Sequence, residues 1–158
     1  MSKARDVRNL ALIGFMGTGK SVVGQFVAAQ LGFEFVDTDA LVEANAGRTI
    51  TEIFRDEGEP AFRERERAVA LALAARQGAV IATGGGLVTY RDNLEQLKAH
   101  ALVVCLWASP ATIFERVRDH THRPLLQTPD PQHRIELMLA AREPFYRQAD
   151  VLINTEFR

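Results

Sequence analysis

The sequence predicts an α/β fold with three layers, in which a central five-stranded parallel sheet is flanked by helices. Segments typical of strands alternate with segments of helical length along the 158 residues. The strand segments are near-continuous apolar runs, as expected for parallel strands that are buried on both faces. The five expected strands are residues 10–13, 33–36, 79–82, 101–107 and 151–153.

Capping residues indicate where several helices begin. Thr49 and Glu52 have the spacing of a capping box, in which each side chain bonds the backbone N–H of the other residue. Pro60 suits the first turn of a helix, because its missing N–H has no partner there in any case. Ser109 and Pro110 form another pair of N-cap and first helical residue. We therefore expect helices to start near residues 50, 60 and 110.

The composition excludes several classes of function. The chain is 47% hydrophobic and 25% charged, with a net charge of −1, which is typical of a single globular domain over residues 1–158. Without a basic field or a long apolar run, neither nucleic acid nor a membrane is expected as a partner. The lone cysteine, Cys105, cannot form an internal disulfide. Together with the missing signal segment, it favours a cytoplasmic protein, which we expect to be monomeric.

The segment from Gly14 to Ser21 fits the phosphate-binding P-loop, G-x-x-x-x-G-K-[ST]. A short apolar strand precedes it and a helix-length segment follows, which is the context that supports this motif. Backbone N–H groups of the loop can approach phosphate oxygens closely, and the helix N-terminus adds partial positive charge. Lys20 would reach the β- and γ-phosphates of ATP, and the Ser21 hydroxyl would bind Mg²⁺.

Two alternatives to the P-loop are a chance glycine turn and a dinucleotide-binding loop. The second fits poorly, because Val22 stands where a third glycine would be needed. The expected nucleotide-binding residues in this segment are Gly14, Gly17, Thr18, Gly19, Lys20, Ser21 and Val22.

Asp37 and Asp39 directly follow the second expected strand. A P-loop enzyme needs a further acid near its Mg²⁺, and this acid usually ends a strand beside the P-loop strand. The later strands end in Thr83 and Ala108, which supply none. If extended geometry continues, both carboxylates project to one side, so that one could bind the metal, the role we expect for Asp37, and the other could accept a proton from the attacking hydroxyl. Alternatively, Asp39 caps a helix that starts near residue 40.

Arg63 and Glu66 share one face of the helix that follows Pro60, by their i, i+3 spacing. A buried Glu66 could orient Arg63 to hold a carboxylate through two parallel hydrogen bonds. The neighbouring Glu64 and Arg65 fit a solvated helix face with ion pairs. The glycine triplet 84–86 follows the third strand and permits a ligand to approach the backbone, with a simple tight turn as the alternative.

Residues 119–132 contain three prolines and mixed polarity, which argues against a regular element. In a phosphoryl-transfer enzyme such a loop would be a lid over ATP, and Arg123 within it could neutralise the transferring phosphoryl group. A plain surface loop is the alternative. Arg142 lies near an expected helix break at Pro144 and suits a surface residue as well as a ligand.

These motifs, in this order, resemble the shikimate kinase family over nearly the whole chain. The matching segments are the P-loop, Asp37-x-Asp39, residues 53–66 with Gly58-Glu59 and Phe62-Arg63-x-x-Glu66, Gly84-Gly85-Gly86, Arg123-Pro124-Leu125-Leu126 and Arg142-x-Pro144-x-Tyr146. The resemblance implies a P-loop kinase fold with a lid, and transfer of the ATP γ-phosphoryl group to the 3-hydroxyl of shikimate. It also implies a helical substrate-binding segment at about residues 39–67.

The resemblance further implies a role for each matching residue. Lys20, Asp39 and Arg123 would be catalytic, and Ser21 and Asp37 would bind Mg²⁺. Asp39, Arg63, Gly84, Gly85, Gly86 and Arg142 would bind shikimate, with the two arginines on its carboxylate. Arg116 would pack on the adenine ring, and Arg123 would also contact the nucleotide.

One departure and two rival functions remain open at this level. Family members usually continue beyond the position of Thr155 into a final helix, without which part of the sheet face would lie uncovered. A following segment, a shortened chain or a partner would each account for this. The rivals are another small-molecule kinase, such as a gluconate kinase, and a ligand-sensing regulatory domain. The catalytic set favours the enzyme, and Arg63 and Arg142 favour shikimate.

Overall fold

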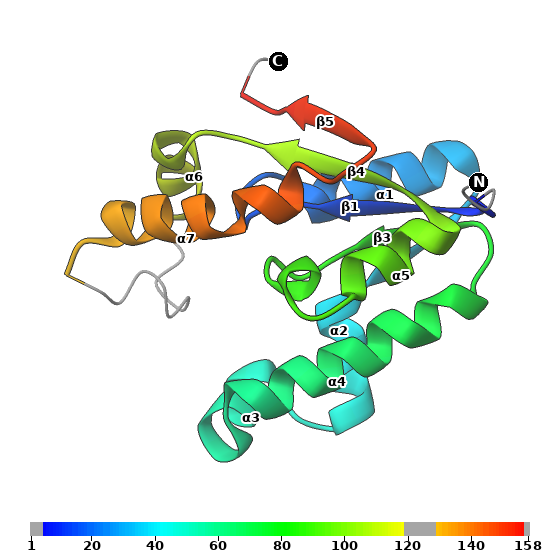
Figure 1. The fold of residues 1–158 in the computed structure, drawn as a ribbon, viewed down its shortest axis with the longest axis horizontal. Coiled ribbons are helices and arrows are strands. Elements are labelled where there is room, and N and C mark those ends of the chain that lie inside the picture. The colour runs from blue at the N-terminus through cyan, green and yellow to red at the C-terminus, as the bar shows by residue number, and fades with distance from the viewer. Residues whose placement is uncertain (1–4, 119–128, 157–158) are drawn as a thin grey trace.

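The structure is a computed structural model that describes residues 5–118 and 129–156. It confirms the α/β fold: five strands form one parallel sheet in the order β2-β3-β1-β4-β5 (Figure 1). The strands are β1 (Asn9–Ile13), β2 (Glu34–Asp37), β3 (Ala79–Ala82), β4 (Ala101–Trp107) and β5 (Val151–Asn154). Each of the five apolar runs singled out in the sequence forms one of these strands.

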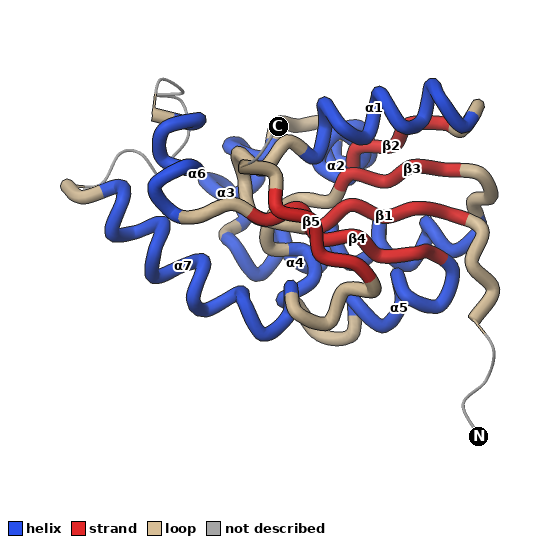
Figure 2. The backbone as a smooth tube through the Cα atoms, turned by 90° about the horizontal axis from the view of Figure 1, so that it is seen from above, coloured by secondary structure: helices blue, strands red, loops and turns tan. Residues whose placement is uncertain are grey.

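Helices cover the two faces of the sheet unequally (Figures 1 and 2). A small core around Leu12 and Val80 packs against α1, whereas a larger core around Ile13 and Ile81 packs against the helices of the other face. The helices are α1 (Lys20–Leu31), α2 (Thr38–Ala46), α3 (Ile50–Glu57), α4 (Glu59–Ala72), α5 (Asn93–His100), α6 (Pro110–Val117) and α7 (Pro131–Tyr146). Short 3-10 turns, η1 (Leu73–Ala75) and η2 (Leu87–Thr89), flank β3.

The predicted helix starts are largely confirmed. Thr49 and Glu52 form the capping box at α3, Pro60 lies in the first turn of α4, and Ser109 Oγ accepts the Thr112 N–H at α6. Two expectations were wrong in detail. Pro144 does not break α7, which continues to Tyr146, because a proline near the end of a helix removes only one bond of its last turns. Residues 131 and 132, expected in the irregular segment, belong to α7, and residues 119–128 of that segment lie outside the described residues.

The sheet face beside β5 is less covered than the rest. Val151, Leu152 and Ile153 are 41%, 53% and 45% exposed. Among the described residues, no helix combines the length and apolar character needed to cross a bilayer.

Candidate active site

A cavity of about 440 Å³ lies at the carboxyl ends of β1, β2 and β3, where parallel sheets bind ligands. It brings together most of the residues singled out in the sequence, although they come from segments far apart in the chain. From that set, its walls include Gly17, Gly19, Lys20, Ser21, Val22, Asp37, Asp39, Arg63, Gly84, Gly85, Gly86 and Arg142. Gly14, Thr18 and Arg116 do not line it, and Arg123 lies outside the described residues.

The P-loop wraps the start of α1. Gly19 is the N-cap of the helix and has a φ of +99°, a left-handed conformation that favours glycine. The Lys20 ammonium donates to the carbonyl oxygens of Gly14 and Phe15, so in this structure the lysine spans its own loop. Thr18 is buried and its hydroxyl donates to Phe15 O at 2.7 Å, which braces the loop from inside. A phosphate group placed here would face the helix N-terminus.

Arg116 joins the P-loop to the end of β5. Its Nη1 donates to Gly17 O at 3.0 Å and to Thr155 Oγ1 at 3.1 Å, and its Nη2 donates to Thr155 O at 2.8 Å. The side chain therefore lies next to the nucleotide loop. The stacking on adenine that the resemblance implies stays a prediction.

The two aspartates line the cavity, but not in the manner expected. β3, rather than β2, is the neighbour of β1 on this side, and Asp37 reaches the cavity from the next strand along. Asp37 also caps α2, because its Oδ1 accepts the N–H groups of Asp39 at 2.9 Å and of Ala40 at 3.3 Å. The alternative that Asp39 is the cap was wrong. The chain turns into a helix after Asp37, so the two carboxylates are not arranged as on an extended strand.

Asp39 lies in an environment that disfavours its charged form. Burial raises the pKa of this carboxyl, and the negative charge of Asp37 raises it further, while Lys20 and Arg63 oppose the shift. A carboxyl group with a raised pKa is a better proton acceptor than a solvated one. The position of Asp39 therefore suits a general base next to an acceptor hydroxyl.

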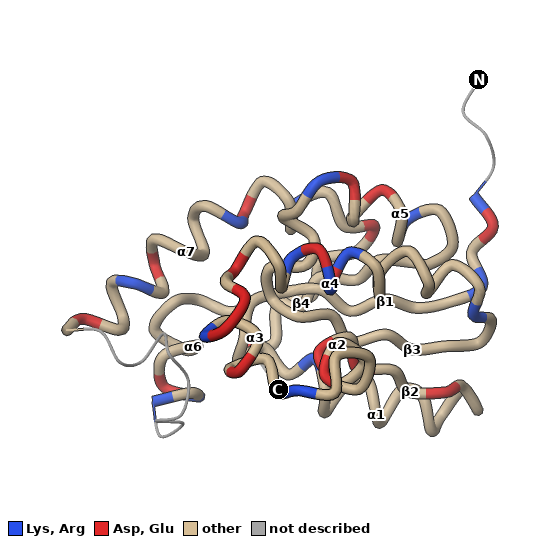
Figure 3. Tube along the Cα trace, turned by 90° about the horizontal axis from the view of Figure 1, so that it is seen from below, with Lys and Arg blue, Asp and Glu red and all other residues tan. Residues whose placement is uncertain are grey.

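Arg63 and Glu66 form the pair that the helical spacing predicts. Arg63 Nη1 lies 2.7 Å from Glu66 Oε1, and the Glu66 side chain is only 1% exposed. Burial raises the pKa of Glu66, and Arg63 opposes that shift. Arg63 also lies 3.4 Å from the more exposed Glu59, on a helix where acidic and basic residues alternate (Figure 3). Arg67, by contrast, turns away from the site to pair with Asp92.

The glycine triplet provides space for the charged side chains. A Cβ atom added at Gly84 would lie 2.6 Å from Asp39 Oδ1 and 2.9 Å from Glu66 Oε2. One added at Gly85 would lie 3.0 Å from Arg142 Nη1, and one at Gly86 would lie 2.6 Å from Arg63 Nη2. Any larger residue would displace these groups, so the triplet is more than a tight turn.

Arg142 completes the site, with support that the sequence reasoning did not assign. Its guanidinium lies 5.1 Å from the centre of the Phe15 ring, within the range of a cation–π contact. Tyr146, one helical turn further along α7, is buried and donates to Gly85 O at 2.8 Å. Among the described residues, no ion pair involves Arg142. The motif Arg142-x-Pro144-x-Tyr146 was the available signal for the tyrosine.

Comparison with known proteins agrees with this geometry. A sequence model of the shikimate kinase family matches residues 16–157. The shikimate kinase of Symbiobacterium thermophilum is 50% identical over 143 residues, which cover 89% of this chain and 82% of that protein.

The chain belongs to the shikimate kinase family.

A solved structure of the family supports the same conclusion at the level of the fold. The shikimate kinase from Acinetobacter baumannii in complex with shikimate superimposes with a TM-score of 0.91 at 40% identity, covering 96% of this chain and 86% of that one. A gluconokinase from Sinorhizobium meliloti superimposes with a TM-score of 0.60 at 22% identity, covering 98% of this chain and 86% of that one, so it shares only the fold. Family membership therefore favours shikimate over gluconate as the acceptor.

Proposed function

We propose that this member of the family transfers the γ-phosphoryl group of ATP to the 3-hydroxyl of shikimate, in the biosynthesis of aromatic amino acids. The observation that carries the proposal is the single cavity shared by Lys20, Asp39, Arg63 and Arg142. The P-loop lysine in this cavity can bind the phosphates of the donor. The two arginines can bind the carboxylate of an acceptor, and the carboxyl group can accept the proton of its hydroxyl.

On the donor side, the P-loop amides and Lys20 would hold the β- and γ-phosphates of ATP. Arg116 would contact the adenine, from a position already beside Gly17. Arg123, which lies outside the described residues, would neutralise charge on the transferring group from the lid expected over residues 119–132. Hydrogen exchange at 119–132 is expected to slow only when both substrates are bound.

Mg²⁺ would be held by Ser21 and Asp37, which both line the cavity. This small donor set fits the ion, because Mg²⁺ in kinases takes one or two protein oxygens and completes its shell with phosphates and water. When bound, the ion neutralises charge on the phosphate oxygens. A cluster of three protein ligands is not required, and the described residues contain none.

On the acceptor side, Arg63 and Arg142 would hold the shikimate carboxylate against the glycine triplet. The 3-hydroxyl oxygen would then attack the γ-phosphorus, the bond to the bridging oxygen would break, and ADP would leave. Asp39 would accept the hydroxyl proton. Since phosphoryl transfer depends mainly on positioning and charge neutralisation, holding the two substrates in line would provide most of the rate enhancement.

An acceptor assay tests the proposal. Release of ADP would be measured with shikimate, quinate and gluconate, and with Lys20→Ala as the inactive reference. Shikimate is expected to support turnover. In NMR spectra of the product, coupling between phosphorus and the ring protons should place the phosphate on the 3-hydroxyl. Preference for gluconate would make the chain a sugar-acid kinase. Binding of shikimate without any ADP release would favour the ligand-sensing alternative. The monomeric state and the cytoplasmic location stay predictions.

A further inference from the structure

We infer that Tyr146 is a positioning residue of the acceptor site, whose hydroxyl holds the Gly85 peptide against which the Arg142 guanidinium packs. The inference rests on the proposed role of Arg142 in binding the acceptor carboxylate, and it adds a residue that does not line the cavity itself.

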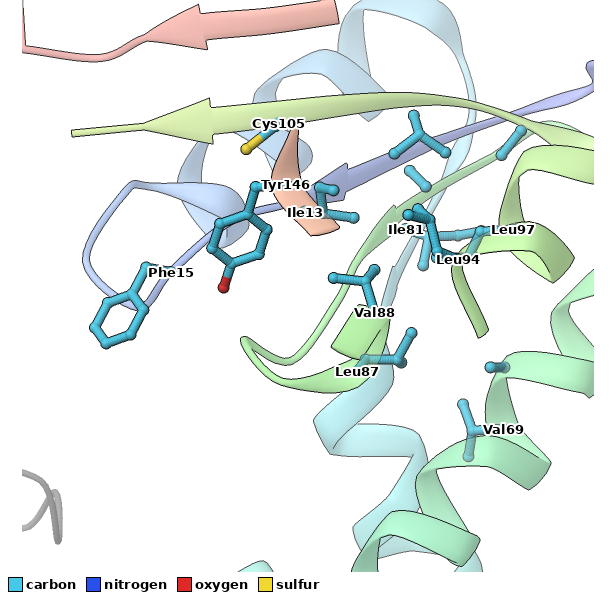
Figure 4. Close-up of a cluster of buried hydrophobic side chains, with 14 of the residues drawn as sticks. Ile13, Phe15, Val69, Ile81, Leu87, Val88, Leu94, Leu97, Cys105 and Tyr146 are labelled. Atoms are coloured by element: carbon cyan, nitrogen blue, oxygen red, sulfur yellow. The ribbon is translucent and has the colours of Figure 1, made fainter. Parts of the chain in front are cut away.

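The first support is the placement of the tyrosine. Tyr146 follows Arg142 by four residues on α7, so both side chains project from one helix face. The tyrosine is 1% exposed and packs in the core that contains Ile13 and Phe15. Figure 4 shows its ring beside Ile13, with the hydroxyl directed away from Cys105. A hydroxyl so deeply buried is costly unless it is bonded, and it donates to Gly85 O at 2.8 Å.

The second support is the position of the guanidinium. Arg142 Nη1 would lie 3.0 Å from a Cβ atom at Gly85, so the arginine packs directly on the peptide that the tyrosine bonds. Burial raises the pKa of Tyr146 to about 12, and the charge and hydrogen bonding of Arg142 oppose that rise. The tyrosine hydroxyl therefore fixes, through its bond to Gly85 O, the peptide on which the arginine packs.

The third support is a contrast with Arg63. That arginine is oriented by Glu66 at 2.7 Å, whereas no ion pair of the described residues involves Arg142. The Phe15 ring provides a surface for the Arg142 guanidinium but does not fix its rotation within the plane of contact. The Gly85 peptide provides the second contact of the guanidinium, and Tyr146 holds that peptide in place. Arg142 lines the cavity from this position.

The substitution Tyr146→Phe tests the inference, because it removes the hydroxyl and keeps the packing. The KM for shikimate is expected to rise about tenfold, as for the loss of one hydrogen bond that orders the binding site, with the KM for ATP unchanged. Tyr90→Phe is the matched control. The Tyr90 hydroxyl bonds the exposed Glu64 at 3.1 Å, so its loss should leave both KM values as they are. An unchanged shikimate KM in Tyr146→Phe would overturn the inference.

A double-mutant cycle separates positioning from a general structural role. In an Arg142→Lys background, where the planar donor fork is gone, Tyr146→Phe should raise the shikimate KM less than twofold. The same tenfold rise in both backgrounds would show that the tyrosine does not act through Arg142 and would overturn the inference.

A measurement without substrate keeps this test distinct from the proposed function. In the unliganded protein, Tyr146→Phe should speed amide hydrogen exchange at residues 84–89, where Leu87 N donates to Gly84 O and Thr89 N donates to Gly86 O. If the wild-type chain did not phosphorylate shikimate, the proposed function would fall, and this exchange would still decide the role of Tyr146. Exchange equal to that of the wild type would count against it.

Discussion

The two halves of the site are built in different ways. The phosphate-binding loop of the donor half is one contiguous segment, from Gly14 to Val22, in which backbone groups and a helix N-terminus surround the expected phosphate site. The acceptor half takes its residues from α2, α4, the loop after β3 and α7, over residues 39–142. The phosphate-binding loop is therefore specified locally, whereas the acceptor half exists only when the helices pack correctly.

A second difference lies within the acceptor half. Arg63 has a buried carboxylate partner, so much of its charge is already compensated. Arg142 is instead held by an aromatic ring and by the bare Gly85 peptide, which Tyr146 bonds. Of the two cations, Arg142 thus carries the less compensated charge toward an incoming carboxylate.

The largest effect is expected from breaking the donor half alone. Lys20→Ala should lower turnover at least a hundredfold, because charge stabilisation of the transferring group is lost, while shikimate binding measured by calorimetry stays nearly unchanged. Lys98→Ala is the control, since Lys98 bonds Gln148 O away from the cavity and should retain wild-type kinetics. Near-normal turnover in Lys20→Ala would contradict the assignment of the P-loop as the site of the donor phosphates.

Asp39→Asn should separate function from stability. Turnover is expected to fall at least a hundredfold, because an amide cannot accept the hydroxyl proton. The free energy of unfolding at neutral pH should instead rise. The folded-state pKa of Asp39 is raised, so the ionised carboxylate is disfavoured in the fold above that pKa, and replacing it removes this cost.

A control variant should change the free energy of unfolding in the opposite direction. A hydrogen bond from Arg55 lowers the pKa of the surface residue Asp56, so Asp56→Asn should slightly destabilise the fold and leave turnover unchanged. Chemical denaturation of the three proteins measures the effect. Destabilisation by Asp39→Asn would show that Asp39 supports the structure rather than straining it.

Removing each arginine should sharpen the contrast between them. Arg63→Ala and Arg142→Ala should each raise the shikimate KM about 10- to 100-fold and leave ATP binding nearly unchanged. Only Arg63→Ala should also lower stability substantially, because it leaves Glu66 buried and unpaired. Adding Glu66→Gln to Arg63→Ala should restore stability without restoring the KM. Equal loss of shikimate and ATP binding in Arg63→Ala would make that arginine structural.

The local features of the site could be predicted from the sequence because they depend on spacing. The P-loop is contiguous, and the Arg63–Glu66 pair follows from the helical period. Positions of β3 and β4 followed from their apolar runs.

Features set by tertiary packing could not be predicted in the same way. The order of β3 and β2 beside β1 depends on how crossovers pack, and no local pattern encodes it. The capping role of Asp37 depends on the chain turning into a helix two residues before the expected start. The carbonyl bonded by Tyr146 belongs to a loop 61 residues away in sequence, so only the fold identifies it.

The smallest effect concerns the opposite end of the sheet, where a titratable group serves stability alone. His100 is 1% exposed, and its Nδ1 lies 2.9 Å from Asn9 Nδ2, which also donates to Arg76 O at 3.0 Å. Because Asn9 donates to Nδ1, the ring is neutral and carries its proton on Nε2. This Nε2 has no hydrogen-bond partner among the described residues. Burial lowers the pKa of His100, and the nearby charge of Arg8 lowers it further.

A histidine with a lowered folded-state pKa stabilises the fold fully above its unfolded pKa of about 6.5, and this contribution is lost as the pH falls toward the folded value. In that window the unfolded chain binds up to one more proton, so the free energy of unfolding should decrease by at most about 1.4 kcal/mol per pH unit. His100→Gln should flatten this slope in denaturation at pH 5 to 7 and leave the kinetics unchanged. His133→Gln, which removes an exposed histidine, should retain the slope. A slope that persists in His100→Gln would assign it to other groups.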